Sequence, residues 1–329
     1  MKLRQLDTYG MVPDIIATAC SNSIKLKDVE FRVPCGKCLN CKKKRRSDWS
    51  LRLEHEWMYS DSAFFITLTY NDPSIPRNKG VPTLHKKHLQ DYIKRLRNSH
   101  VAYVSRELGI SKSEVKNRSK AIRYYAVGEY GSKTNRPHYH ILLFNYDIAN
   151  LKPITAQWKN TRTGSPLGFV DIGKVSGKSI NYTTKYMFKQ WGKKDLRQRP
   201  FTLMSRRPMI GTDFLNEYKD FYKQYEIISV RDKNGVLRRM PKAYLYKIYT
   251  KQEKVYKPNK KEYKVETVKD KDWIKRLSEK NYKTFINEKF KEHKENLLIN
   301  YNGDVNQWMI SKDQDNHRKQ REIINNETL

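Results

Sequence analysis

The segment RPHYHILLF at residues 136–144 places two histidines, His138 and His140, one residue apart in an apolar run. Alternate residues of a β-strand project from the same face, so the two imidazoles would lie about 6–7 Å apart along the strand. Paired imidazoles can hold a divalent cation when a further donor lies nearby. The other interpretation is that two histidines occupy a half-buried sheet face and hydrogen-bond to their neighbours.

A predicted hairpin supplies the further donor. Segments 122–131 and 136–146 are rich in aromatic and β-branched residues and flank a short run of turn-forming residues, which predicts two antiparallel strands. A turn centred on that run pairs Glu129 with His138, and directly paired residues have Cβ atoms about 4.5–5.5 Å apart. The pattern therefore predicts a metal site of Glu129, His138 and His140. A register shift of one residue would turn Glu129 away.

A second group of reactive side chains lies in KSINYTTKYMFKQW at residues 178–191. Tyr182 and Tyr186 are four residues apart, and each is followed three residues later by a lysine, Lys185 and Lys189. At about 100° per residue, the phenols and lysines of a helix fall opposite its apolar stripe, which argues against tyrosines that simply pack in the core. Neighbouring lysines would favour a phenolate and hold a phosphate, so the pattern indicates tyrosine attack on a phosphodiester.

The four cysteines of the chain form a third cluster, with Cys35, Cys38 and Cys41 at two-residue spacings and Cys20 fifteen residues before Cys35. Four thiolates could form a closed tetrahedral zinc site. The spacing is not the paired form of most zinc sites, and consecutive short spacings can strain one centre, so free thiols are an equal alternative. In either case we expect reduced cysteines and a cytoplasmic protein.

The charge of the chain predicts a polyanionic partner. Lys and Arg total 67 against 35 acidic residues, a formal net charge of +32, and nucleic acid is the expected ligand. The candidate DNA contacts are Lys42, Lys43, Lys44, Arg45, Arg46, Arg206 and Arg207. A solvated charged face and surface salt bridges are the alternatives. The tyrosines and lysines of 243–257 suit stacked bases and phosphates, or else helix packing.

No membrane partner is expected. No apolar stretch approaches the roughly 20 residues that span a bilayer. The first twenty residues lack the continuous apolar core of a signal peptide.

The order of predicted elements gives the fold class. Strand 63–72, helix 84–99, the hairpin, a helix near 151–160 and strand 168–175 form the order strand–helix–strand–strand–helix–strand. This order predicts an α+β fold, a ferredoxin/RRM-like antiparallel sheet with helices on one face.

The flanking regions are expected to be extensions of this domain. We predict an N-terminal cysteine-containing basic segment at 1–62, a catalytic domain at 63–200, an extension at 201–250 with a hairpin, and a basic, helical or partly disordered tail at 251–329. Trp49, Leu53 and Trp57 recur at helical spacing near the end of the first segment, with Ser47 as the expected N-cap.

Taken in order, the strand FITLTY at 65–70, the histidine pair and the tyrosine–lysine helix resemble the motifs of HUH endonucleases. PCGKCLNCKKKRR near the start and FTLMSRRPMIG at 201–211 are similar, more specifically, to the replication initiators of gokushovirus-type microviruses, which are small circular single-stranded DNA phages. The resemblance covers most of residues 20–250 and does not extend to the tail.

This resemblance implies an HUH endonuclease fold and a set of roles. His138, His140 and Glu129 would hold Mg²⁺ or Mn²⁺, and Tyr182 and Tyr186 would act as alternating nucleophiles. The protein would nick origin DNA and remain attached to the 5′-phosphate, leaving a 3′-hydroxyl for the host DNA polymerase and helicase machinery. It would then rejoin the displaced single strand into a circle in the host cell cytoplasm.

One residue departs from the family pattern, because Tyr139 stands between the histidines where an aliphatic residue is commoner. Its side chain is expected to face away from the site. Two functions of other classes remain as alternatives: a non-catalytic single-stranded DNA- or RNA-binding protein on the same scaffold, and a DNA-packaging protein of a virion.

Overall fold

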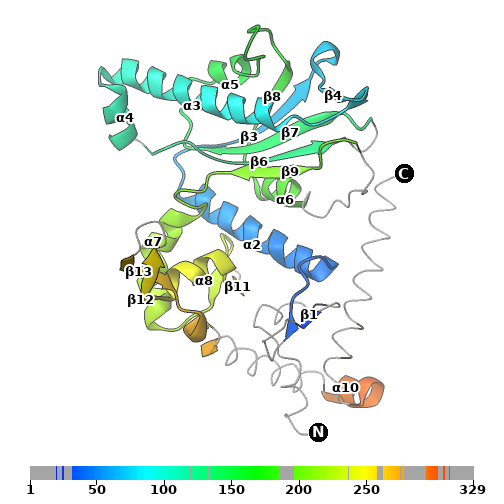
Figure 1. Ribbon diagram of the computed structural model, residues 1–329, viewed down its shortest axis with the longest axis vertical. Coiled ribbons are helices and arrows are strands. Elements are labelled where there is room, and N and C mark those ends of the chain that lie inside the picture. Colours follow the sequence, from blue (N-terminus) through cyan, green and yellow to red (C-terminus); the bar gives the residue numbers. More distant parts are fainter. Residues whose placement is uncertain are drawn as a thin grey trace. The chain divides into compact units, whose positions relative to one another are not determined.

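The chain forms two compact units, shown in a computed structural model (Figure 1). We call Arg52–Phe214 the sheet unit, and Met1–Leu51 together with Leu215–Leu329 the cysteine unit. The helices α2 (Leu39–Met58) and α7 (Thr212–Gln224) each contain residues of both units. The structure describes residues 20, 24–25, 32–118, 120–131, 134–185, 196–235, 237–257, 262–274, 276–277, 294–302, 307 and 311.

The sheet unit is built on one five-stranded sheet with the strand order β8-β3-β7-β6-β9, in which every neighbouring pair is antiparallel. Its strands are β3 (Ala63–Tyr70), β6 (Arg123–Tyr130), β7 (Pro137–Phe144), β8 (Gly168–Lys174) and β9 (Phe201–Met204). β7 lies in the middle, and its aromatic and branched residues are hydrogen-bonded on both sides, which buries nearly the whole strand.

The connections of this sheet are two interlocked split β-α-β units. β3 leads through α3 (Lys86–Leu108) to β6, which is parallel to it with β7 between them. β7 leads through α5 (Lys152–Ala156) to β8, with β3 between them. The predicted order of elements and the antiparallel sheet of the predicted fold class are therefore confirmed.

Alternate residues of β7 face α3 and α5 across the main hydrophobic core. Tyr139, Ile141 and Leu143 are fully buried there, against Leu89 and Leu96 of α3 among others. α3 ends where Gly109 adopts a left-handed conformation with φ 62°, and the Gly109 amide donates to the carbonyl of Arg106. Between β3 and β6 lie η2 (Asp72–Ser74), β4 (Arg77–Asn78), β5 (Val81–Pro82) and α4 (Lys112–Arg118).

The prediction that the helices lie on one face is wrong for α6 (Gly177–Lys185). Tyr182 of α6 packs against Phe65 and His140, whose side chains leave the sheet on the face opposite to Tyr139 (Figure 1). Helices therefore cover both faces, α3 and α5 on one and α6 on the other. Helical periodicity indicates which side of a helix is apolar, but not which face of a sheet receives it.

In the cysteine unit, β1 (Ile24–Lys25) pairs with β2 (Arg32–Val33) ahead of α2. The expected N-cap at Ser47 is wrong, because α2 begins at Leu39 and Ser47 lies inside it. The run of cysteines and cations before Ser47 lacks apolar spacing, which hid the first two turns of the helix from pattern analysis.

The C-terminal part of the cysteine unit contains the predicted hairpin of β10 (Ser229–Arg231) and β11 (Leu237–Arg239), in which Gly235 has φ 77°. α8 (Lys242–Ile248) follows, then a second hairpin of β12 (Thr250–Lys257) and β13 (Glu262–Lys269), and later α10 (Lys294–Tyr301). The expectation of helices or disorder after residue 251 is therefore wrong for this second hairpin. Among the described residues, no helix is long and apolar enough to cross a membrane.

Candidate functional site

The register between β6 and β7 is the predicted one, with Glu129 paired to His138. Glu129 Oε1 lies 2.9 Å from His138 Nε2 and 3.1 Å from His140 Nε2. One atom of each of these three residues lies within 4.8 Å of the others, so the three donors converge on one point of the sheet. We call these three residues the glutamate–histidine cluster.

Neighbouring groups fix the orientation of both imidazoles. His138 Nδ1 lies 3.0 Å from the carbonyl oxygen of Arg136, which can only accept, so Nδ1 carries the proton. In the neutral ring, Nε2 then presents a lone pair to the Glu129 carboxylate, and this contact is favourable only with a proton or metal cation between them. His140 Nδ1 lies 3.1 Å from the hydroxyl of Thr67 on β3.

Burial and electrostatics differ between the members of the cluster. The side chain of His138 is 17% exposed and that of Glu129 only 2%, so the cluster meets solvent at His138. Burial opposes the charged form of Glu129, but hydrogen bonds from His138 and His140 outweigh it and hold its pKa below the usual value. Burial lowers the pKa of His140 and outweighs the opposing hydrogen bond to Glu129. At neutral pH these shifts favour an ionised carboxylate and a neutral imidazole at His140, the forms that bind metals.

Tyr182 lies beside this cluster. Its ring centroid is 5.0 Å from that of His140, with the rings nearly perpendicular, and 6.3 Å from that of Phe65. Lys185 Nζ lies 4.7 Å from the centre of the Tyr182 ring, as the three-residue spacing on α6 allows. The structure therefore brings Tyr182 and Lys185 to the same face of the sheet as the glutamate–histidine cluster. Tyr186 and Lys189 lie outside the described residues.

Several residues of this face were not identified from the sequence. Phe65 and Thr67 on β3 contact His140, and the carbonyl of Arg136 orients His138. Phe169 on β8 pairs with Thr69 of β3, which in turn pairs with His138, so all three lie on the site face. Phe169 is 69% exposed, and a large exposed apolar side chain there offers a stacking surface for a base. Strand alternation alone could have placed Phe65, Thr67 and Phe169 on one face.

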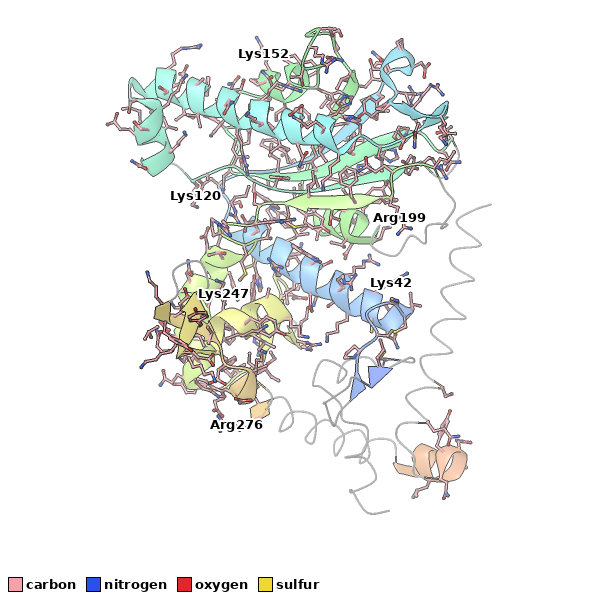
Figure 2. The ribbon with its side chains drawn as sticks, viewed as in Figure 1. Lys42, Lys120, Lys152, Arg199, Lys247 and Arg276 are labelled. Atoms are coloured by element: carbon pink, nitrogen blue, oxygen red, sulfur yellow. The ribbon has the colours of Figure 1, made fainter. Side chains whose placement is uncertain are left out.

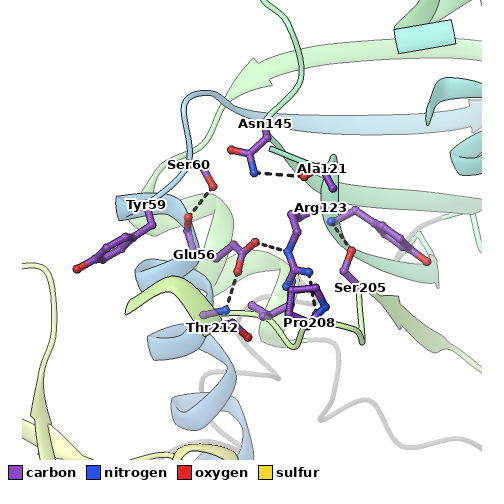
Figure 3. Close-up of polar contacts among 12 residues, drawn as sticks. Glu56, Tyr59, Ser60, Ala121, Arg123, Asn145, Ser205, Pro208 and Thr212 are labelled. Carbon is purple, nitrogen blue, oxygen red and sulfur yellow. Dashed lines mark hydrogen bonds and ion pairs between the residues drawn. The ribbon is translucent and has the colours of Figure 1, made fainter. Parts of the chain in front are cut away.

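Arg206 and Arg207 lie in the loop after β9, which three buried contacts hold in place (Figure 3). Arg123 Nε lies 2.7 Å from Glu56 Oε1, and Arg123 Nη1 donates to the carbonyl of Pro208. The amide of Gly211 donates to Glu56 Oε2 at 2.6 Å. Both loop arginines are exposed, and neither forms an ion pair within the described part of the chain. This arrangement leaves them open to phosphate.

The other predicted DNA contacts, Lys42–Arg46, lie on the first turns of α2 with side chains that are exposed or half-buried. Basic side chains occur on both units, including Lys42, Lys120, Arg199 and Lys247 (Figure 2). In the tyrosine-rich segment 243–257, Tyr244 and Tyr249 are fully buried, so helix packing is the correct interpretation for these two.

The four cysteines also come together, with one sulfur of each within 4.8 Å of the others. Cys20 and Cys41 are buried, while Cys35 and Cys38 are half-buried.

Comparison with known proteins identifies the family. A model of the replication-associated protein ORF2 family matches residues 63–191, which include β3, β6, β7, β8 and α6. The chain is 31% identical over 237 residues to the replication-associated protein ORF2 of Spiroplasma virus 4, across 66% of this chain and 67% of that protein. The chain belongs to this family of replication-associated proteins.

Two further phage relatives support this assignment. This family member is 26% identical over 249 residues to the replication-associated protein VP4 of Bdellovibrio phage phiMH2K, across 72% of this chain and 73% of the relative. It is 25% identical over 179 residues to the replication-associated protein ORF4 of Chlamydia phage 1, across 51% of this chain and 40% of the relative. No solved structure matches the chain significantly. The predicted resemblance to microvirus-type replication proteins is thus confirmed, whereas the roles predicted for individual residues remain predictions.

Proposed function

We propose that this replication-associated protein is a metal-dependent single-strand DNA endonuclease and ligase of the HUH type. It would start and terminate rolling-circle replication of a circular phage genome through a 5′-phosphotyrosine link. The observation that carries the proposal is the convergence of Glu129, His138 and His140 on one sheet face with Tyr182 beside them.

The donor set supports a divalent cation at this cluster. The Nε2 atoms of His138 and His140 and one carboxylate oxygen of Glu129 provide three donors, and the lone pair of His138 Nε2 is directed at the carboxylate. Two nitrogens and one oxygen suit Mn²⁺, and Mg²⁺ is the alternative, although it prefers oxygen ligands. When bound, the cation would polarise a phosphoryl oxygen of the substrate and stabilise the charge that develops on it.

The residues of the chain would then carry out phosphoryl transfer. The hydroxyl oxygen of Tyr182 attacks the phosphorus, forming an O–P bond, while the bond between phosphorus and the 3′-oxygen breaks. The phenolic proton is lost as the bond forms, and the departing 3′-oxygen takes up a proton to become a hydroxyl. The Lys185 ammonium would favour the phenolate and attract the phosphate. The reverse reaction, with a 3′-hydroxyl as the nucleophile, reseals the strand.

A second nucleophile is proposed from the sequence alone. Tyr186 follows Tyr182 by four residues and Lys189 follows Tyr186 by three, which repeats the pairing of Tyr182 with Lys185. With two tyrosines, one could hold the old 5′-end while the other cleaves the regenerated origin. The displaced strand would then be closed into a circle inside the host cell, where host polymerase and helicase extend and unwind the template.

Substrate binding would combine charge and stacking. The exposed loop residues Arg206 and Arg207 and the basic turns of α2 at Lys42–Arg46 offer phosphate contacts. Phe169 offers a stacking surface on the same sheet face as the glutamate–histidine cluster. Single-stranded DNA is the proposed substrate because its bases are free to stack.

The decisive experiment is a cleavage assay on single-stranded oligonucleotides that tile the circular genome encoding this protein, with Mn²⁺, Mg²⁺ or EDTA. The wild-type chain should form a protein–DNA adduct that survives denaturing electrophoresis only when a divalent cation is present. Tyr182→Phe and Tyr186→Phe should each retain an adduct, and the double variant should form none. Tyr103→Phe, on α3, is the matched control and should behave as wild type.

Two outcomes would contradict the proposal. Tight binding without an adduct, across the whole tiling and with either metal, would indicate a non-catalytic binding or packaging protein. An adduct that persists in the double variant would assign the nucleophile to another residue.

A further inference from the structure

The proposed nuclease mechanism does not use the cysteine cluster, which we define as Cys20, Cys35, Cys38 and Cys41. These are the four cysteines of the chain, and one sulfur of each lies within 4.8 Å of the other three. None of the four forms a disulfide. Residues separated by as many as 21 positions along the chain are thus gathered around one point.

The sulfur spacing matches a tetrahedral metal site. Cys38 Sγ lies 3.8 Å from Cys20 Sγ. Four sulfurs about 2.3 Å from a central zinc ion are about 3.8 Å apart along each edge of the tetrahedron. A disulfide would require about 2.05 Å between the sulfurs. The observed separation is therefore that of two ligands sharing a cation.

Backbone amides point at the sulfurs. Cys35 Sγ accepts from the amides of Lys37 at 3.4 Å and Cys38 at 3.2 Å. Cys20 Sγ accepts from the amide of Cys35 at 3.3 Å, and Cys38 Sγ from that of Cys41 at 3.5 Å. Hydrogen bonds donated to sulfur stabilise thiolates, which are the form that binds metal.

Local backbone structure makes this geometry possible. Gly36 has φ 69°, a left-handed conformation that lets the chain turn tightly between Cys35 and Cys38. α2 begins at Leu39, so Cys38 immediately precedes the helix and Cys41 lies in its first turn. The positive end of the helix dipole and the cations at 42–46 offset the negative charge of four thiolates.

We propose that Cys20, Cys35, Cys38 and Cys41 bind one Zn²⁺ ion in a closed structural site. Sulfur donors select zinc over the hard cations that suit the glutamate–histidine cluster. With four protein ligands, no coordination position is left for substrate, so the role is architectural.

The expected role is to join residue 20 to the start of α2. The β1–β2 pairing between Cys20 and Cys35 has only two residues in each strand, which is too short a ladder to be stable by itself. A metal bridging Cys20 to the three later cysteines would supply the missing stabilisation, as in other small metal-dependent segments.

The first test is elemental analysis of the full-length chain, expressed with added zinc and purified under reducing conditions in the presence of EDTA. About one zinc per chain is expected to remain bound. The thiols should react slowly with a disulfide reagent until a strong zinc chelator is added. Four immediately reactive thiols in a zinc-free, folded wild-type chain would overturn the proposal without any variant.

Cobalt substitution then identifies the ligands. Co²⁺ bound to four thiolates gives an intense sulfur-to-metal charge-transfer absorption and the visible bands of a tetrahedral centre. Cys38→Ser and Cys41→Ser should lose these bands and the zinc. His138→Ala is the matched control and should keep both, because it changes the other cluster only. Loss of the bands in His138→Ala, with retention in the cysteine variants, would overturn the assignment.

Discussion

The glutamate–histidine cluster and the cysteine cluster each gather donor atoms within 4.8 Å, but different structures support them. Glu129, His138 and His140 lie on two hydrogen-bonded strands in the interior of a five-stranded sheet. The cysteines lie on a glycine turn, the first turn of a helix and a residue from an earlier segment. The sheet positions its donors through its own register and packing, whereas the cysteines depend on a short ladder and on one another.

This difference indicates two relationships between metal and fold. A site on the central strands should be formed before its metal arrives, which suits an ion that must leave coordination positions open for substrate. A site made of turns should form with its metal, whose binding energy then becomes folding energy. The four predictions that follow test this contrast, in order of decreasing expected effect.

The largest effect is expected from Glu129→Gln. The substitution preserves shape but removes the negative charge between the two imidazoles, and loss of several kcal/mol of metal-dependent stabilisation would slow nicking at least about a thousandfold. Adduct formation with Mn²⁺ under single-turnover conditions measures it. Zinc content should remain that of wild type, and Glu107→Gln at the exposed end of α3 should have no effect. Nicking within tenfold of wild type would show that Glu129 is not a ligand.

Zinc removal should produce the next largest effect and should be confined to the cysteine unit. Amide hydrogen exchange at the start of α2 should accelerate by at least about a hundredfold when zinc is withdrawn, because the metal's binding energy stabilises that structure. Exchange in β7 should not change when Mn²⁺ or Mg²⁺ is withdrawn. Equal acceleration in both regions would remove the contrast between the clusters.

Thr67→Val should have a moderate effect on metal affinity. The Thr67 hydroxyl contacts His140 Nδ1, and removal of a partner that orients a metal-binding histidine usually weakens metal binding about 10- to 100-fold. Mn²⁺ titration of the adduct-forming activity measures this change. Thr69→Val is the matched control on the same face of β3, since its hydroxyl forms no hydrogen bond recorded among the described residues. Equal effects of the two substitutions would argue against an orienting role for Thr67.

The smallest effect is the pH dependence of the metal-free sheet unit. Burial lowers the pKa of His140 below its ordinary value of about 6.5, so the unfolded chain binds the proton more tightly than the folded chain. The stabilising contribution is complete above about pH 6.5 and is lost as pH falls through the lowered pKa, by at most about 1.4 kcal/mol per pH unit for one proton. Hydrogen exchange of β7 in EDTA should show a smaller pH dependence for His140→Gln than for wild type. A larger dependence in the variant would contradict the sign.

The sequence predicts the central hairpin and its register well because local signals determine both. Turn-forming residues lie symmetrically between two β-rich segments, and the apolar alternation of β7 permits only one face for His138 and His140. The orienting groups Thr67 and Arg136 were missed because their contacts depend on the pairing of β3 with β7 and on the backbone conformation at the turn.

Other elements were missed because tertiary structure outweighs composition. The β12–β13 hairpin is rich in lysine and glutamate, which suggests a helix or disorder, yet Tyr256 pairs with Tyr263 and their rings lie 5.1 Å apart. The face of the sheet that α6 covers also depends on the whole topology and cannot be derived from the helix sequence.

The central strand β7 assigns different tasks to alternate residues. His138 and His140 face the proposed chemistry, while Tyr139, Ile141 and Leu143 lie in the core shared with α3. The Tyr139 hydroxyl lies 2.8 Å from that of Tyr70 and accepts from the amide of His85. Over evolutionary time, adjacent codons of this short segment would therefore answer to separate pressures, one set by replication of the genome and the other by the abundance of folded protein. A lineage could exchange its core residues in compensating pairs with α3 and leave the histidines unchanged.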